Sequence, residues 1–130
     1  MADFKRGIVV TALAGQGVEA EVRPTLTSPD RSRRRASFAA RRTKKGAMVG
    51  FHGRRSDTIV PVPSCTLVTP ELAAAQPVAE ALAITGASRK AALSVTVTSS
   101  LEGLDVAVTG GKPLDGPLRI ALAAICAPIW

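Results

Sequence analysis

The stretch that decides the fold is RRRASFAARRTKKGAMVGFHGRRSDTIVPV, residues 33–62. Within residues 33–42 the side chains alternate in character, and Ala36, Phe38 and Ala40 fall on one face of an extended chain. The opposite face carries basic or polar side chains, namely Arg33, Arg35, Ser37 and Arg41. Such alternation is typical of a β-strand with one buried face.

The residues that follow predict a hairpin. Residues 43–46, TKKG, have the length and the glycine of a hairpin loop. Residues 47–52 then form the return strand, and residues 58–62 form a third strand. We therefore predict a basic hairpin on a small antiparallel sheet.

The second half of the chain predicts helices around another hairpin. The Thr-Pro-Glu sequence at residues 69–71 is typical of a helix start, which predicts a helix over residues 69–84. Pro77 should kink or split it, because proline lacks a backbone donor. Alternating apolar residues predict a second hairpin, followed by a terminal helix, within residues 91–127.

The N-terminal part predicts a leading helix over residues 1–16, with an apolar stripe that predicts a packed amphipathic helix. The basic strand and hairpin region covers residues 18–62 and begins with a short strand at residues 18–22. All 130 residues are expected to form one domain. The predicted class is α+β, with a small antiparallel sheet built from hairpins and flanked by helices.

The charge of the chain is concentrated in its first half. Residues 1–55 hold 13 Lys and Arg against 4 Asp and Glu, whereas residues 56–130 hold 4 against 6. Ten basic residues and no acidic residue lie between Arg31 and Arg55. Such a cluster repels itself and is best tolerated beside a polyanion or in solvent. The residues predicted to bind RNA are Arg33, Arg34, Arg35, Arg41, Arg42, Lys44, Lys45, Arg54 and Arg55.

RNA is favoured over DNA as the partner. Arginine and lysine contacts to phosphate give affinity without sequence readout, so no specificity for DNA is expected. Only three phenylalanines, one tryptophan and no tyrosine are present, which argues against a base-stacking platform. Folded RNA, recognised by its backbone, fits this composition best. The competing interpretation is a structural domain whose arginines are merely solvated.

Cysteine and histidine content excludes several classes of protein. The two cysteines, Cys65 and Cys126, imply no disulfide framework, so we expect a cytoplasmic protein. His52 is the only histidine and lies in no catalytic motif, and no catalytic residue is predicted. The longest apolar stretch, residues 120–130, is far shorter than the ~20 residues that cross a bilayer, so no membrane partner is expected.

Several short motifs, in order, resemble one family. The motifs are Arg33-Arg34-Arg35-Ala36, Gly50-Phe51, Ser56, Ile59-Val60, and Cys65 followed by Pro70-Glu71-Leu72. At these motifs the sequence is similar to the central region of the RNA 5-methyluridine methyltransferases. These enzymes methylate uracil in ribosomal or transfer RNA. The resemblance extends over residues 4–84. It implies that the triple-arginine strand at residues 33–35 helps to grip RNA.

The resemblance also implies which cofactors the complete enzyme uses. Cys65 occupies the place that, in cluster-bearing relatives, supplies the fourth thiolate of a 4Fe–4S cluster, although Thr66 replaces the usual proline. The other three thiolates come from an upstream cysteine group, and Cys65 alone cannot hold a cluster. S-adenosylmethionine and the catalytic groups belong to a C-terminal domain of the family. We therefore expect this chain to be a catalytically incomplete, RNA-binding portion of such an enzyme. It is expected to have no cofactor of its own and to have the catalytic C-terminal domain as a partner. The alternative is a free-standing basic RNA-binding or ribosome-associated protein.

Overall fold

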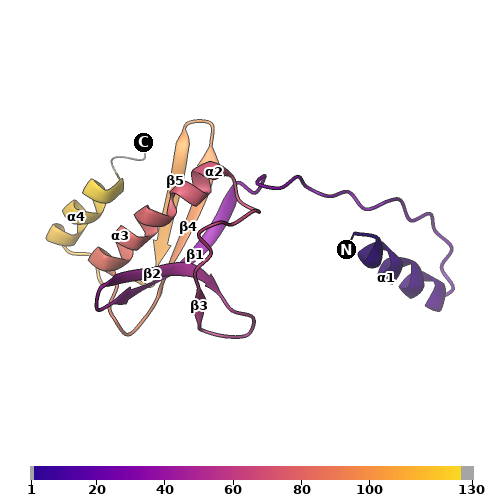
Figure 1. Ribbon diagram of the computed structural model, residues 1–130, viewed down its shortest axis with the longest axis horizontal. Coiled ribbons are helices and arrows are strands. Elements are labelled where there is room, and N and C mark those ends of the chain that lie inside the picture. Colours follow the sequence, from indigo (N-terminus) through magenta and orange to yellow (C-terminus); the bar gives the residue numbers. More distant parts are fainter. Residues whose placement is uncertain (1, 127–130) are drawn as a thin grey trace.

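The computed structural model describes residues 2–126 and shows an α+β fold around one five-stranded antiparallel sheet (Figure 1). The strands are β1 (Arg35–Thr43), β2 (Gly46–His52), β3 (Ile59–Val60), β4 (Leu93–Ser100) and β5 (Gly103–Thr109). Their order in the sheet is β3-β2-β1-β4-β5. The predicted fold class, a small antiparallel sheet built from hairpins with flanking helices, is confirmed.

The two predicted hairpins join through β1. Thr43 pairs with Gly46 at the end of the β1–β2 hairpin, as the sequence predicts. The other edge of β1 pairs with β4, which places Phe38 opposite Val95. Because β4 lies about fifty residues further along the chain, local patterns carry no signal for this pairing. It fuses the two hairpins into one sheet.

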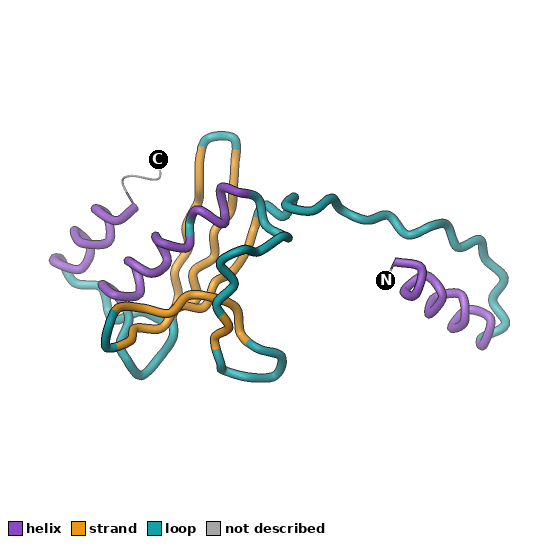
Figure 2. The backbone as a smooth tube through the Cα atoms, viewed as in Figure 1, coloured by secondary structure: helices purple, strands orange, loops and turns teal. Residues whose placement is uncertain are grey.

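Two helices pack against the sheet and a third packs against one of them (Figures 1 and 2). The three are α2 (Pro70–Ala74), α3 (Gln76–Gly86) and α4 (Gly116–Cys126). Both α2 and α3 contact strands, and α4 contacts α3. The helix predicted over residues 69–84 is split at Ala75, and Pro77 stands in the first turn of α3, where its missing N–H is tolerated. The terminal helix is confirmed as far as it is described, since residue 127 and the side chain of Cys126 lie outside the described residues.

The core forms between these helices and one face of the sheet. Phe38 is 1% exposed, and its ring centroid lies 5.3 Å from that of Phe51. Leu72 and Leu82 supply the helical side of the core. The buried positions of β1 and β4 alternate with exposed or half-buried ones, so the opposite face of the sheet carries the polar residues.

The first helix, α1 (Ala2–Gly15), forms where it is predicted but does not pack as predicted. It has no buried residue, and Phe4 is 69% exposed. Figure 1 shows it away from the sheet, beyond the extended stretch that leads into β1. The predicted strand at residues 18–22 is also wrong, because the Arg6 guanidinium donates to the Val22 carbonyl at 2.6 Å and holds this segment against the helix. None of the described helices is long and apolar enough to cross a bilayer.

The start of α4 provides a first test of the fold. Asp115 Oδ1 accepts a hydrogen bond of 2.8 Å from the Leu118 N–H, the arrangement of a helix N-cap. Asp115→Ala should lower the free energy of unfolding by about 1 kcal/mol, since the first turn then loses its acceptor. Asp115→Asn keeps an acceptor oxygen and should restore most of that loss. Urea unfolding followed by circular dichroism measures both, and equal stability of Asp115→Ala and the wild-type protein would contradict the cap.

Candidate nucleic-acid interface

The start of β1 is anchored by main-chain hydrogen bonds to the segment that precedes α2. Arg31 N–H donates to the Thr66 carbonyl at 2.7 Å, and Arg33 N–H donates to the Leu67 carbonyl at 2.9 Å. The Thr69 N–H in turn donates to the Arg33 carbonyl at 3.0 Å. The triple-arginine sequence is therefore held by its backbone, which leaves its side chains exposed.

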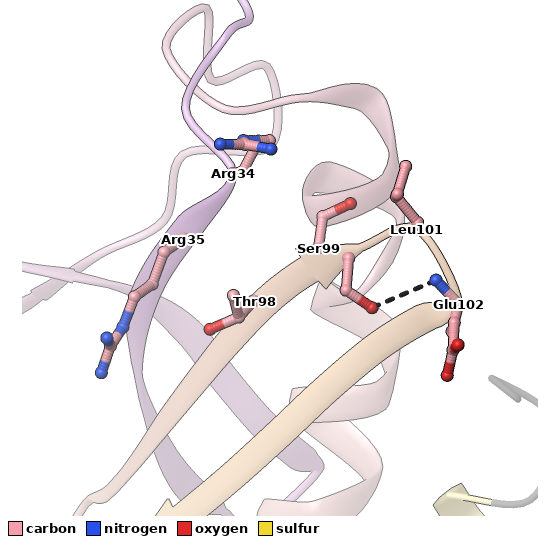
Figure 3. Close-up of a pocket in the computed structure, with 7 residues that line it drawn as sticks. Arg34, Arg35, Thr98, Ser99, Leu101 and Glu102 are labelled. Carbon is pink, nitrogen blue, oxygen red and sulfur yellow. Dashed lines mark hydrogen bonds between the residues drawn. The ribbon is translucent and has the colours of Figure 1, made fainter.

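A hollow of about 640 Å³ lies at this end of β1, between Arg34 and Arg35 and residues 98–102 at the β4–β5 turn. We call it the strand-start basin. Thr98 lies on the side of Arg35, and Ser99 lies on the side of Arg34 (Figure 3). The Ser99 N–H donates to the Arg34 carbonyl at 2.7 Å, which fixes the two strands to each other here.

Hydrogen bonds within the turn shape the floor of the basin. Ser100 Oγ donates to the Gly103 carbonyl at 2.9 Å and accepts from the Glu102 N–H at 3.3 Å (Figure 3). The hydroxyls of Thr98 and Ser99 are not used in these bonds. Arg34 and Ser99 line the hollow on one side of the sheet, Arg35 and Thr98 line it on the other, and the lining contains one acidic residue, Glu102. Guanidinium groups in such a setting suit phosphate oxygens, and hydroxyls suit sugar oxygens.

The remaining predicted RNA-binding residues lie elsewhere on the sheet. Arg41, Arg42, Lys44 and Lys45 lie at the β1–β2 hairpin end, and Arg42 is half-buried whereas the other three are exposed. Arg35 and Arg41 are separated by six residues of strand, which corresponds to about 20 Å. Arg54 and Arg55 lie in the β2–β3 loop, which projects from the sheet away from the basin (Figure 1).

The structure therefore distributes the nine residues over three places rather than one. Only Arg34 and Arg35 of the nine share the strand-start basin. Among residues 2–126, no salt bridge joins any of these cations to a carboxylate. The charge is thus available to a polyanion, and binding of RNA by these residues stays a prediction.

Sequence reasoning missed the hydroxyls of β4. Thr98 and Ser99 line the basin, and Thr96 Oγ1 lies 2.7 Å from Ser37 Oγ in a hydrogen bond. The sequence signal was the alternation of Ser and Thr with valine along residues 94–98. That alternation predicts a strand, but it does not reveal that the strand lies beside the arginines.

The surroundings of Cys65 do not fit a metal cluster built by this chain alone. Cys65 is half-buried and lines a hollow of about 630 Å³ together with Arg33, Ser37 and Phe51. No group of three or more His, Cys, Asp or Glu side chains that could hold a metal ion occurs in the described part of the chain. A 4Fe–4S cluster takes four ligands, so this thiol by itself supplies too few.

Relatives found by comparison with known proteins share one description. A Brucella suis protein named as an uncharacterized RNA methyltransferase is 34% identical over 122 residues, which is 94% of this chain and 29% of the relative. Relatives with the same description occur in Agrobacterium fabrum, 33% identical over 119 residues, and in Caulobacter vibrioides, 37% identical over 121 residues. Over most of its length the chain is similar to one region of these proteins named as RNA methyltransferases. No family model matches the sequence.

The match covers most of this chain but only part of each relative. The chain spans 29% of the length of the Brucella, Agrobacterium and Caulobacter relatives, while these cover 86–94% of the chain. The expected resemblance to a partial region of an RNA methyltransferase is therefore confirmed. The match includes the basic hairpin, the strand-start basin and the second hairpin within one homologous unit.

Proposed function

We propose that this chain is the RNA-binding portion of an S-adenosylmethionine-dependent RNA (uracil-5-)-methyltransferase that acts on ribosomal or transfer RNA. The observation that carries the proposal is the strand-start basin, where Arg34 and Arg35 meet the hydroxyls of Thr98 and Ser99. Its position within a region shared with RNA methyltransferases supports RNA as the ligand. In this proposal, methyl transfer is carried out by the larger part of the relatives that lies outside the match.

The physical basis of the proposal is phosphate binding by arginine. A guanidinium group can donate two parallel hydrogen bonds to one phosphate, and its charge does not titrate near neutral pH. Arg34 and Arg35 project on opposite sides of the strand, so the basin can receive backbone from either side. The more distant groups at the hairpin turn and the β2–β3 loop would add contacts along a longer RNA.

The proposal assigns no cofactor to this chain. S-adenosylmethionine would donate the methyl group in the complete enzyme, and its site would belong to the catalytic part. Cys65 is placed by resemblance where a fourth cluster ligand would stand, but the described residues offer no companion ligands for it. We therefore propose that the chain alone neither binds S-adenosylmethionine nor methylates RNA.

The decisive experiment removes the basin arginines. The double variant Arg34→Ala/Arg35→Ala should bind a labelled hairpin RNA about tenfold more weakly, because it can no longer form these charge-assisted hydrogen bonds to phosphate. The slope of log affinity against log salt should also become shallower, by about 0.7 to 0.9 for each phosphate that the variant no longer neutralises. Fluorescence anisotropy titrations at several salt concentrations measure both quantities.

A matched control separates the site from total charge. Lys112→Ala/Arg119→Ala removes the same charge from exposed positions near α4, outside the basin. We expect it to change the affinity less than twofold. Equal weakening by the two double variants would show that only net charge matters, and unchanged binding by Arg34→Ala/Arg35→Ala would discard the basin as an RNA site.

A further inference from the structure

The face of the sheet opposite the helices carries a set of hydroxyl side chains between two arginines. We call it the open face. Strand alternation and the β1–β4 register place on it Arg35, Ser37, Arg41, Ser94, Thr96 and Thr98. Five of these six positions lie in β1–β4 pairs: Arg35 is opposite Thr98, Ser37 is opposite Thr96, and Ser94 is opposite Ala39. The open face is therefore polar along β4 and at both ends of β1, and the buried Ala39 separates Ser37 from Arg41.

Two features fix the hydroxyls of this face in place. Ser37 Oγ and Thr96 Oγ1 are 2.7 Å apart and share a hydrogen bond across the strands. Thr96 and Thr98 are half-buried and β-branched, which restricts their side-chain rotamers. Each hydroxyl keeps further capacity to donate or accept. A ligand would meet preorganised groups, so little side-chain entropy is lost on binding.

No phenylalanine lies on this face in the described part of the chain, and strand alternation in β2 places there one aromatic ring, the exposed imidazole of His52. Phe38 and Phe51 pack on the helical side of the sheet, and Phe4 belongs to α1. With a single imidazole and no phenylalanine, the face offers little surface for stacking unpaired bases, which is how single-stranded RNA is commonly held. Its chemistry suits a ligand that presents hydroxyls and phosphates rather than exposed base planes.

We propose that the open face lies against the minor groove of an A-form RNA duplex and contacts its 2′-hydroxyls through Ser37, Thr96 and Thr98. This inference rests on the proposed function and names the form of RNA that the chain prefers. The A-form minor groove is wide and shallow and displays 2′-hydroxyls, so a sheet surface can reach them. The minor groove of B-form DNA is only about 6 Å wide and lacks these groups.

Charge on the open face supports the same ligand. Arg35 and Arg41 flank the hydroxyls at about 20 Å from each other, a spacing that lets each reach a different phosphate strand beside the groove. The neighbouring strand β5 contributes one acid to this side, Asp105, which pairs with Thr98. Cationic ends around a neutral hydroxyl centre complement a groove whose rims are anionic and whose floor is hydroxylated.

The test removes hydroxyls without changing charge. Ser37→Ala/Thr96→Val/Thr98→Val deletes both partners of the Ser37–Thr96 hydrogen bond, so no buried group is left unpaired. Thr85→Val/Ser88→Ala is the matched control, which removes hydroxyls from the region of α3 on the helical side. Each protein is titrated against an RNA hairpin, a DNA hairpin of the same sequence and single-stranded RNA, all at one salt concentration.

The wild-type protein should prefer the RNA hairpin to both other probes by about tenfold, since two or three hydrogen bonds to 2′-hydroxyls form only with that probe. The triple hydroxyl variant should lose that preference, while its affinity for DNA and its salt slope stay unchanged. The control variant should keep the preference. A second readout uses the wild-type protein alone: 2′-deoxy substitution within the stem of the RNA hairpin should weaken binding to the level of DNA. This readout holds even if the triple variant folds poorly.

The outcomes separate this inference from the proposed function. Binding of RNA hairpin and DNA hairpin with equal affinity would overturn the hydroxyl contact while leaving RNA binding by the arginines intact. Tighter binding of single-stranded RNA, or an unchanged preference in both the triple variant and the 2′-deoxy probe, would also overturn it. Failure to bind any of the three probes would overturn the proposed function and this inference together.

Discussion

Phe38→Ala is expected to remove most of the free energy of unfolding of the protein. Phe38 is 1% exposed, lies in the central strand β1, and contacts the ring of Phe51. Truncating a buried phenylalanine to alanine costs about 3–5 kcal/mol, because buried apolar surface is removed and a cavity remains. Small domains have total stabilities near the lower end of about 5–15 kcal/mol. Urea unfolding followed by circular dichroism at 222 nm, with a thermal melt beside it, measures the loss of stability.

The same substitution on the first helix is the control. Phe4 is 69% exposed on α1, so Phe4→Ala removes no buried side chain. We expect its urea midpoint to equal that of the wild-type protein within error. If Phe38→Ala also left the midpoint unchanged, the face of β1 assigned to the core would be wrong. The arginines would then lose their assigned positions, because strand alternation places them relative to Phe38.

The hairpins were predictable because their signals are local. Alternating side chains over residues 33–42 and a glycine at residue 46 specify a strand and its turn within a short stretch. The split between α2 and α3 was equally predictable, since it follows from the geometry of Pro77. The pairing of β1 with β4 was not predictable, because strands of similar composition can pair in several orders and only the packed core selects one.

The first helix shows the limit of amphipathic patterns. An apolar stripe on residues 1–16 predicts a helix that packs, and the helix is present, yet Phe4 and Ile8 remain exposed. A hydrophobic stripe indicates that a helix can bury one face, but it does not predict which element packs against that face. Here the helix is held by the segment after it, through Arg6 and Val22, and not by the sheet.

The class of ligand could be predicted from the sequence, but the positions of the candidate site residues relative to one another could not. The acid-free run of basic residues between Arg31 and Arg55 indicates a polyanion partner from composition alone. Composition could not reveal that these residues divide among the start of β1, the hairpin turn and the β2–β3 loop. It also could not bring Thr98 and Ser99 to Arg34, because their proximity depends on the β1–β4 register. The number of basic residues can be counted in the sequence, whereas their proximity to one another and to the hydroxyls depends on the tertiary structure.

Gly50→Ala is expected to be the most damaging conservative change in the sheet. Gly50 lies in β2 where the chain leaving β3 crosses closely, and a Cβ atom there would overlap the Val60 carbonyl oxygen. It would also lie 2.6 Å from the Val60 carbonyl carbon and 2.9 Å from Pro61 Cα. These atoms belong to the backbone, so no side-chain rotation relieves the overlap. The strand β3 must move away from β2.

The expected cost of Gly50→Ala is about 3 kcal/mol or more, since overpacking a well-packed core typically costs about 1–3 kcal/mol and the overlap here is with backbone atoms. The matched control is Gly7→Ala, the same change in α1, where no atom lies within 4 Å of the added Cβ. Alanine favours helix over glycine, so the control should not destabilise the protein. Urea midpoints of both variants are compared with that of the wild-type protein. A Gly50→Ala midpoint equal to the wild-type value would show that β3 does not approach β2 as described, and the β2–β3 loop with Arg54 and Arg55 would have to lie elsewhere relative to the sheet.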